Sequence, residues 1–119
     1  MARLMSSTEL HQRIEKDEDF VLIDVLGTDD FTDEHIPGAV NIPLAELRQR
    51  ATSDLSRNQR IVVYGFDHDE QSSNQAATLL EELGFRKVSD FDGGISAWKK
   101  AGFLTEGKNP KIVGEMAEL

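Results

Sequence analysis

The sequence contains no cysteine among its 119 residues. Without cysteine, the chain can form no disulfide bond, offer no thiolate to a metal ion and carry no thiol nucleophile of its own. Every covalent mechanism that passes through a cysteine is therefore excluded for this chain acting alone.

Long apolar segments are also missing. No apolar run approaches the roughly 20 residues that a membrane-spanning helix needs, and the start, MARLMSSTEL, has no long apolar stretch of the secretory-signal type. We therefore expect a cytoplasmic protein that does not bind membranes.

Positive charge is scarce. The chain has 13 Lys and Arg against 22 Asp and Glu, and its formal net charge is −9. This net field opposes the approach of a nucleic acid, so we expect no nucleic-acid partner. With 39% hydrophobic residues, the length suits one globular domain with a single core.

Strand-like and helix-like segments alternate along the chain. Short apolar or β-branched runs predict strands at 20–25, within 35–43, at 61–64 and at 87–91. Capping residues and apolar stripes predict helices that start after Ser6 and cover 28–35, 44–51, 72–83 and 93–101. This alternation predicts an α/β domain in which a parallel sheet is sandwiched between helices.

Ligands of such domains bind outside the carboxyl ends of the strands. That rule brings Asp24, the loop after Tyr64 and the Gly93–Gly94 pair to one edge of the sheet. A loop between a strand and a helix commonly holds an anion, yet this one carries Asp67, Asp69 and Glu70.

The ordered motifs resemble the rhodanese, or thiosulfate sulfurtransferase, family. They are VLIDV, FTDEHIPGAVNIPLAEL, IVVYG and SNQAATLLEELGFRKVSDFDGGISAWKKAGF, which together span roughly Leu4 to Thr105. The resemblance implies a three-layer α/β/α domain with a central parallel sheet of about five strands. The active loop would lie between the fourth strand and the next helix. We expect this rhodanese-like domain over residues 1–106 and a C-terminal tail over 107–119.

The family's nucleophile is missing from the position that the resemblance assigns to it. Active members place a cysteine directly after the apolar strand and usually a basic residue in the loop, whereas this chain has Gly65 there. No Lys or Arg occurs between Arg60 and Arg86, and the loop is longer than the usual sulfurtransferase loop. The former active-site loop consists of Gly65, Phe66, Asp67, His68, Asp69, Glu70, Gln71, Ser72 and Ser73.

We predict no catalytic residue, metal or cofactor in this loop. The leading hypothesis is a catalytically inactive rhodanese-like domain that acts as a protein-binding or regulatory module and uses the acidic loop to bind a basic protein partner. The alternative is a sulfurtransferase-family protein that takes part in sulfur transfer with a partner that supplies the cysteine. A third possibility is a degenerate domain without any ligand.

Two side chains of the loop admit more than one role. His68 between Asp67 and Asp69 could contribute to a metal site, but consecutive loop residues rarely point at one centre, which favours a solvated acidic loop. Phe66 either fills the vacated pocket or stands exposed as an anchor for a partner.

Other candidate residues have simpler structural interpretations. Ser72 and Ser73 are predicted to cap the following helix rather than act as nucleophiles. Asp24 and His35 are interpreted as structural hydrogen-bonding residues, and Trp98 as a core residue.

Overall fold

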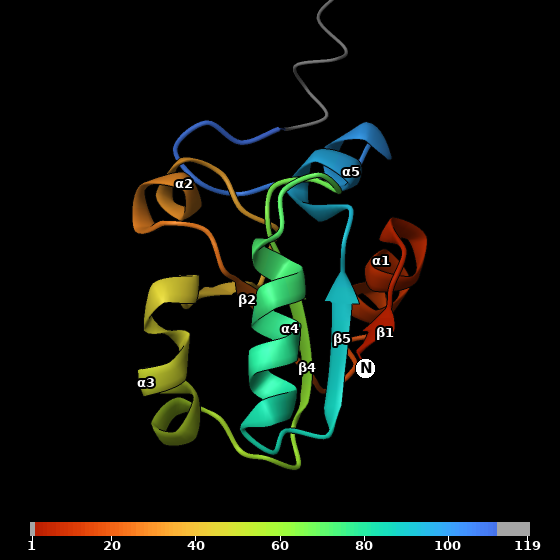
Figure 1. Cartoon of the computed structure of the whole chain (residues 1–119). Helices are drawn as coiled ribbons and strands as arrows, with labels where there is room; N and C mark the ends of the chain where they lie inside the picture. The colour runs from red at the N-terminus through yellow and green to blue at the C-terminus, as the bar shows by residue number, and fades with distance from the viewer. Residues whose placement is uncertain (1, 112–119) are drawn as a thin grey trace, which may run out of the picture.

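The computed structural model describes residues 2–111 as a three-layer α/β/α domain (Figure 1). Its five strands form one sheet in the order β1-β5-β4-β2-β3, and all neighbouring strands are parallel. The strands are β1 (Arg3–Leu4), β2 (Val21–Asp24), β3 (Val40–Asn41), β4 (Arg60–Tyr64) and β5 (Lys87–Phe91). The helices are α1 (Ser7–Glu15), α2 (Thr28–Asp33), α3 (Leu44–Asp54), α4 (Ser72–Glu82) and α5 (Gly94–Lys100). The predicted fold class is confirmed.

Alternation along the strands divides the core between the two faces of the sheet. Ile61 and Val63 of β4 pack with apolar residues of α3 and α4, whereas Val62 and Tyr64 pack with those of α1 and α5. Successive residues of a strand point to opposite faces, so a strand covered on both sides must be apolar throughout. This requirement explains the continuous apolar run IVVY.

The first helix begins as the sequence predicts, although only half of the capping box forms. Ser6 is the N-cap of α1, and its hydroxyl accepts a hydrogen bond from Glu9 N at 3.1 Å. The Glu9 carboxylate does not return to the cap, because it pairs with Arg3 and Arg13 instead. Strand β1, which is only two residues long, is not among the four strands that the sequence predicts.

The predicted domain boundary at residue 106 stays a prediction. Just beyond it, Lys108 N and Asn109 N donate hydrogen bonds to the carbonyls of Thr32 and Asp33 on α2. Residues 112–119 of the predicted tail lie outside the described residues.

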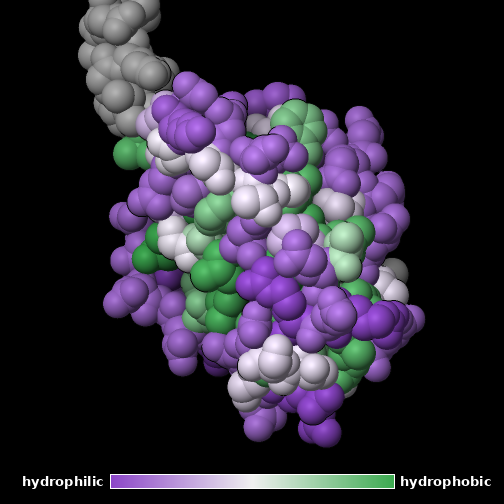
Figure 2. All heavy atoms as spheres, turned by 90° about the vertical axis from the view of Figure 1, so that its left-hand side faces the viewer, coloured by the Kyte–Doolittle hydropathy of each residue, from purple (hydrophilic) through white to green (hydrophobic). Residues whose placement is uncertain are grey.

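The surface over α2 and α3 is mostly hydrophilic, with hydrophobic side chains visible between the polar ones (Figure 2). No helix within the described range is long and apolar enough to cross a membrane.

Candidate functional site in the loop between β4 and α4

The loop at the carboxyl edge of the sheet is held from behind by the start of α5. Ile95 N donates to the Gly65 carbonyl at 3.0 Å, and Ser96 N donates to the Phe66 carbonyl at 2.9 Å. Gly94 has a φ of 66°, and a Cβ atom there would lie 2.6 Å from the backbone of both loop residues. Only glycine fits this approach, so Gly94 serves the close packing of α5 against the loop.

The Glu70 side chain folds back into the loop and takes its hydrogen-bond donors. Its Oε1 accepts from Phe66 N at 3.2 Å and from the Ser72 hydroxyl at 2.6 Å, and its Oε2 accepts from Ser72 N at 2.8 Å. Ser72 is the first residue of α4, so the carboxylate also lies at the positive end of the helix dipole. The loop therefore contains an anion, and that anion belongs to the chain itself.

The same carboxylate takes the space into which a side chain at position 65 would project. A Cβ atom added to Gly65 would lie 2.5 Å from Glu70 Oε1 and 2.5 Å from the Ser72 hydroxyl oxygen. Real Cβ atoms essentially never approach other atoms so closely, and residue 65 is buried. Glycine at position 65 and glutamate at position 70 are thus sterically linked.

Asp67 organises the turn that directs Glu70 inward. Its Oδ1 accepts from the backbone amides of Asp69 and Glu70, both at 3.0 Å. The three loop acids consequently differ in role: Asp67 stabilises the turn, Asp69 is exposed, and Glu70 points into the loop. Of the three acids, Glu70 is the one that accepts hydrogen bonds from Phe66 N and Ser72.

Phe66 does not fill the vacated pocket. Its side chain is 51% exposed, which excludes the first of the two roles left open by the sequence, whereas the role of a partner anchor stays a prediction. The Glu70 carboxylate occupies the space beside Gly65 instead, and Phe66 is an exposed apolar group of the loop.

The sequence matches a known protein family over most of its length. The profile of the rhodanese-like domain matches residues 6–101. The chain belongs to the rhodanese-like domain family. The family is tied to sulfur transfer: thiosulfate sulfurtransferase GlpE of Coxiella burnetii is 30% identical over 99 residues, which cover 83% of this chain and 89% of GlpE.

Two further relatives show how the rhodanese-like domain is placed in other proteins. The putative sulfur carrier protein YrkF of Bacillus subtilis is 34% identical over 87 residues, 73% of this chain and 45% of the relative. The HTH-type transcriptional regulator Rv0324 of Mycobacterium tuberculosis is 34% identical over 98 residues, 82% of this chain and 42% of the relative. The chain thus spans less than half the length of these two curated relatives.

Solved structures agree with the fold. The solution structure of the rhodanese-like domain of the Anabaena sp. protein Alr3790 superposes with a TM-score of 0.83 at 35% identity, covering 92% of this chain and 82% of that chain. The β4–α4 loop lies where the resemblance places the family's active loop, between the fourth strand and the next helix.

The capping roles predicted for Ser72 and Ser73 are wrong. Gln71 is the N-cap of α4 and makes no side-chain cap hydrogen bond. The Glu70 carboxylate accepts the Ser72 amide in place of a serine cap, whereas the buried Ser73 hydroxyl makes no hydrogen bond to a backbone amide of residues 2–111. Sequence reasoning missed this arrangement because a carboxylate two residues before the helix can accept the same amide.

His68 pairs with an acid that lies outside its own loop. Its Nδ1 contacts an oxygen of Asp92, the residue after β5, and the hydrogen bond to Asp92 raises the pKa of His68. Burial alone would raise the pKa of Asp92, but hydrogen bonds from Asn74 and His68 lower it below its ordinary value. The His68 ring is 82% exposed, so this pair joins the loop to the sheet edge at the surface.

Asn74 connects this pair to a buried acid that sequence reasoning missed. Its amide nitrogen donates to Asp90 at 2.5 Å and to Asp92 at 3.0 Å. Both acids lie at the carboxyl end of β5, the edge that the sequence had already singled out for Asp24 and the loop. Their position was therefore the signal that could have found them. No cluster of three or more metal-ligating side chains occurs among residues 2–111.

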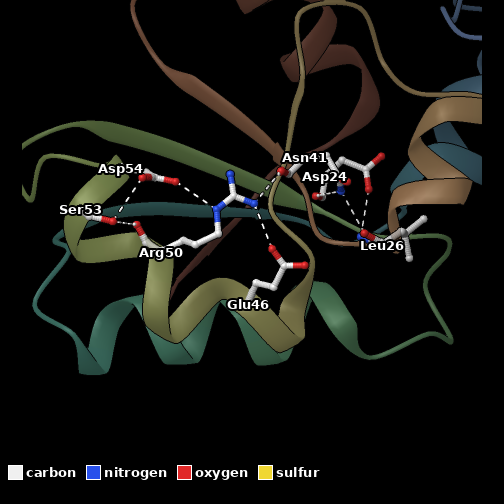
Figure 3. Close-up of polar contacts among 7 residues, drawn as sticks. All are labelled: Asp24, Leu26, Asn41, Glu46, Arg50, Ser53 and Asp54. Carbon is white, nitrogen blue, oxygen red and sulfur yellow. Dashed lines mark hydrogen bonds and ion pairs between the residues drawn. The ribbon is translucent and has the colours of Figure 1, made fainter.

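The Asp24 carboxylate accepts a hydrogen bond from the backbone just after β2, in agreement with its predicted structural role. Asp24 Oδ1 accepts from Leu26 N at 2.9 Å, while Asn41 donates to the carbonyls of both residues (Figure 3). Arg50 of α3 reaches the Asn41 carbonyl from the other side, at 3.5 Å. Burial raises the pKa of Asp24, although the neighbouring Tyr64 hydroxyl and the Leu26 amide favour its charged form.

His35 and Trp98 also take the structural positions that were predicted. The His35 ring stacks on Phe31 with ring centroids 4.0 Å apart, and its Nδ1 hydrogen-bonds to the Phe31 carbonyl at 2.8 Å. Trp98 is 2% exposed and donates from Nε1 to the Leu104 carbonyl.

Replacing Asp90 by Asn should stabilise the domain at neutral pH. Asp90 is 3% exposed, and burial raises the pKa of its carboxyl because the charged form loses hydration. Folding therefore favours the protonated form, so the charged carboxylate is destabilising above the folded-state pKa. Asp90→Asn keeps an oxygen for Asn74 and should raise the free energy of unfolding by roughly 1 kcal/mol at pH 7.

Urea denaturation of both proteins at several pH values checks this result. The difference should shrink as the pH falls toward the ordinary carboxyl pKa of 3.8, where both folded and unfolded Asp90 take up a proton. Asp19→Asn, at an exposed site, is the control and should change nothing. A destabilised Asp90→Asn protein at pH 7 would contradict the argument.

Proposed function

We propose that this rhodanese-like domain does not transfer sulfur itself and serves as a protein-binding module through the loop from Gly65 to Ser73. One observation carries the proposal: the Glu70 carboxylate occupies the space beside Gly65 and accepts hydrogen bonds from the Phe66 and Ser72 amides. In sulfur transfer such donors would stabilise a substrate anion or a thiolate. Here they are satisfied without a ligand.

The outer surface of the loop supports recognition of a basic partner. Phe66 is exposed at the end of β4, and the acids Asp67 and Asp69 follow it directly. Aromatic side chains beside charges are frequent anchors of protein interfaces, and the charges add specificity and speed to association. A partner with an apolar recess bordered by Lys or Arg matches this surface.

The packing of the loop favours this function over sulfur transfer with a cysteine from a partner. A partner's persulfide entering the loop would have to displace the Glu70 carboxylate from three hydrogen bonds. The displaced carboxylate would then repel the anionic sulfur. Binding at the outer surface requires neither change.

A titration with a short synthetic peptide of arginine and leucine tests the proposal. Binding should weaken as salt is added, because the field of exposed acids reaches only about 10 Å at 0.1 M salt. Asp67→Asn with Asp69→Asn should weaken it several-fold, while the amide oxygen introduced by Asp67→Asn still accepts the turn amides. Phe66→Ala should weaken binding without changing its salt dependence.

The matched control carries the same change of charge elsewhere. Glu15→Gln with Glu82→Gln removes two acids from exposed sites on α1 and α4 and should leave the affinity nearly unchanged. Equal losses of peptide affinity in the two double variants would mean that binding depends only on the net charge of the protein. Such a result, or binding indifferent to salt, would refute the role of the loop.

A further inference from the structure

A second candidate surface lies at the opposite edge of the sheet from the loop. In Figure 1 the β5 arrow points toward the end of the molecule that carries the loop, so the amino ends of β4 and β5 lie at the other end. A groove of about 420 Å³ opens there. Five of the chain's 13 Lys and Arg residues line it: Arg3, Arg13, Arg60, Arg86 and Lys87. Such a gathering is unexpected in a chain with a net charge of −9.

The strand register arranges three of these cations in a row. Arg60 of β4 and Lys87 of β5 are directly paired, and Arg3 of β1 pairs with Ser89, two residues further along β5. Paired residues of neighbouring strands, and residues two apart on one strand, share a face of the sheet. Neighbouring strands lie about 4.8 Å apart, so the three cations extend across roughly 10 Å rather than converge on one point.

Most of this charge is not neutralised within the described chain. Arg3 and Arg13 pair with Glu9, and Arg13 also with Glu18. By contrast, the ion pairs among residues 2–111 include none with Arg60, Arg86 or Lys87, all of which are exposed.

Apolar side chains also line the groove, together with one acid, Glu81. Met5 and Val62 are buried, and Phe20 is only partly buried. A groove with an apolar floor and spaced cations suits a chain of alternating acidic and apolar residues. A single phosphate, in contrast, needs donors that converge on one group.

We propose that this groove, lined by Arg3, Arg60, Arg86 and Lys87 at the amino ends of β1, β4 and β5, binds an extended acidic segment of a partner protein. The carboxylates of the segment pair with the exposed Arg60, Arg86 and Lys87, and an apolar side chain between them packs over the partly buried Phe20. The protein's own negative charge disfavours nucleic acid as the occupant. The site is independent of the loop, because the two lie at opposite ends of the strands.

The test uses the whole chain labelled with ¹⁵N and a short synthetic peptide of glutamates interrupted by phenylalanine. Amide shifts should change at residues 3, 60 and 86–89, and the same peptide with glutamine for glutamate should leave them unchanged. Shifts confined to residues 65–73, or no shifts up to about 1 mM peptide, a concentration that detects even weak binding, would overturn the proposal.

Reversing the charge of groove residues tests whether the peptide binds in the groove or to the surface in general. Arg60→Glu with Lys87→Glu should weaken peptide binding at least about tenfold. The control, Arg48→Glu with Lys100→Glu, makes the same change of net charge at exposed sites outside the groove and should stay within about twofold of the parent. Amide spectra report whether both variants remain folded, and Arg60→Gln with Lys87→Gln gives a milder test.

Three outcomes decide against an acidic segment as occupant. The first is an equal loss of peptide affinity in the groove and control variants. The second is inorganic phosphate that binds the same residues more tightly than the peptide. The third is duplex DNA that binds these residues more tightly than the peptide. Failure here would leave the proposed function of the loop untouched, because that function is tested with a basic peptide and different variants.

Discussion

A thiol introduced by Gly65→Cys alone should react slowly and support no efficient sulfur transfer. Its Cβ atom would approach Glu70 Oε1 and the Ser72 hydroxyl to 2.5 Å, so the carboxylate must move before the side chain fits. The displaced charge would then lie beside the new sulfur. A neighbouring carboxylate disfavours a second anion, so the pKa of the thiol should exceed the roughly 8.5 of a free cysteine.

Adding Glu70→Ala should reverse much of this effect. The substitution removes the clash and the negative charge, and it frees the Phe66 and Ser72 amides to face the sulfur. Amide donors and a helix N-terminus lower a thiol pKa, so alkylation at pH 7 should accelerate by about one to two orders of magnitude over Gly65→Cys alone. Thiosulfate turnover should still remain low, because the loop contains Asp67 and Asp69 and no basic residue.

Alkylation rates measured across pH give the pKa of each thiol directly. Gln49→Cys, on the exposed surface of α3, provides the control thiol and should react alike with or without Glu70→Ala. A Gly65→Cys thiol that already reacts as a low-pKa thiolate, with no gain from Glu70→Ala, would show that Glu70 does not control this space.

Gly94→Ala should destabilise the domain strongly, because it combines two unfavourable effects at one position. The new methyl group would lie 2.6 Å from the carbonyl oxygens of Gly65 and Phe66, at a φ of 66° that L-residues rarely adopt. Backbone strain and overpacking together should lower the free energy of unfolding by about 3 kcal/mol or more.

Gly102→Ala measures the cost of backbone strain without the cost of overpacking. Gly102 has a φ of 91°, but no atom lies within 4 Å of the position of its added Cβ. Only backbone strain remains there, so the loss should be about 1 kcal/mol. Urea denaturation of both variants measures the difference, and similar losses would argue against close packing of α5 on the loop.

The predictable part of the fold follows from long, strongly patterned segments. The run IVVY needed apolar residues on both faces of the sheet, and the stripe on α4 showed which side of that helix is buried. The strand Arg3–Leu4 could not be found in this way, because two exposed residues have no periodicity. Its pairing with β5 depends on tertiary contacts.

The loop shows where sequence reasoning reaches its limit. Its residues and its place after the fourth strand were predictable, whereas the roles of its three acids were not. Asp67, Asp69 and Glu70 have similar chemistry, and only the turn fixed by the Asp67 carboxylate decides that Glu70 points inward. Phe66 is exposed, and the Glu70 carboxylate accepts the Ser72 amide in place of a serine cap.

The most direct test of the central claim is an assay of the purified protein with thiosulfate and cyanide. Because the chain has no cysteine and Glu70 occupies the space of the missing side chain, we expect no thiocyanate above the buffer rate. Loss of a nucleophile commonly lowers turnover by several powers of ten. Sustained thiocyanate production by the protein alone would contradict the account.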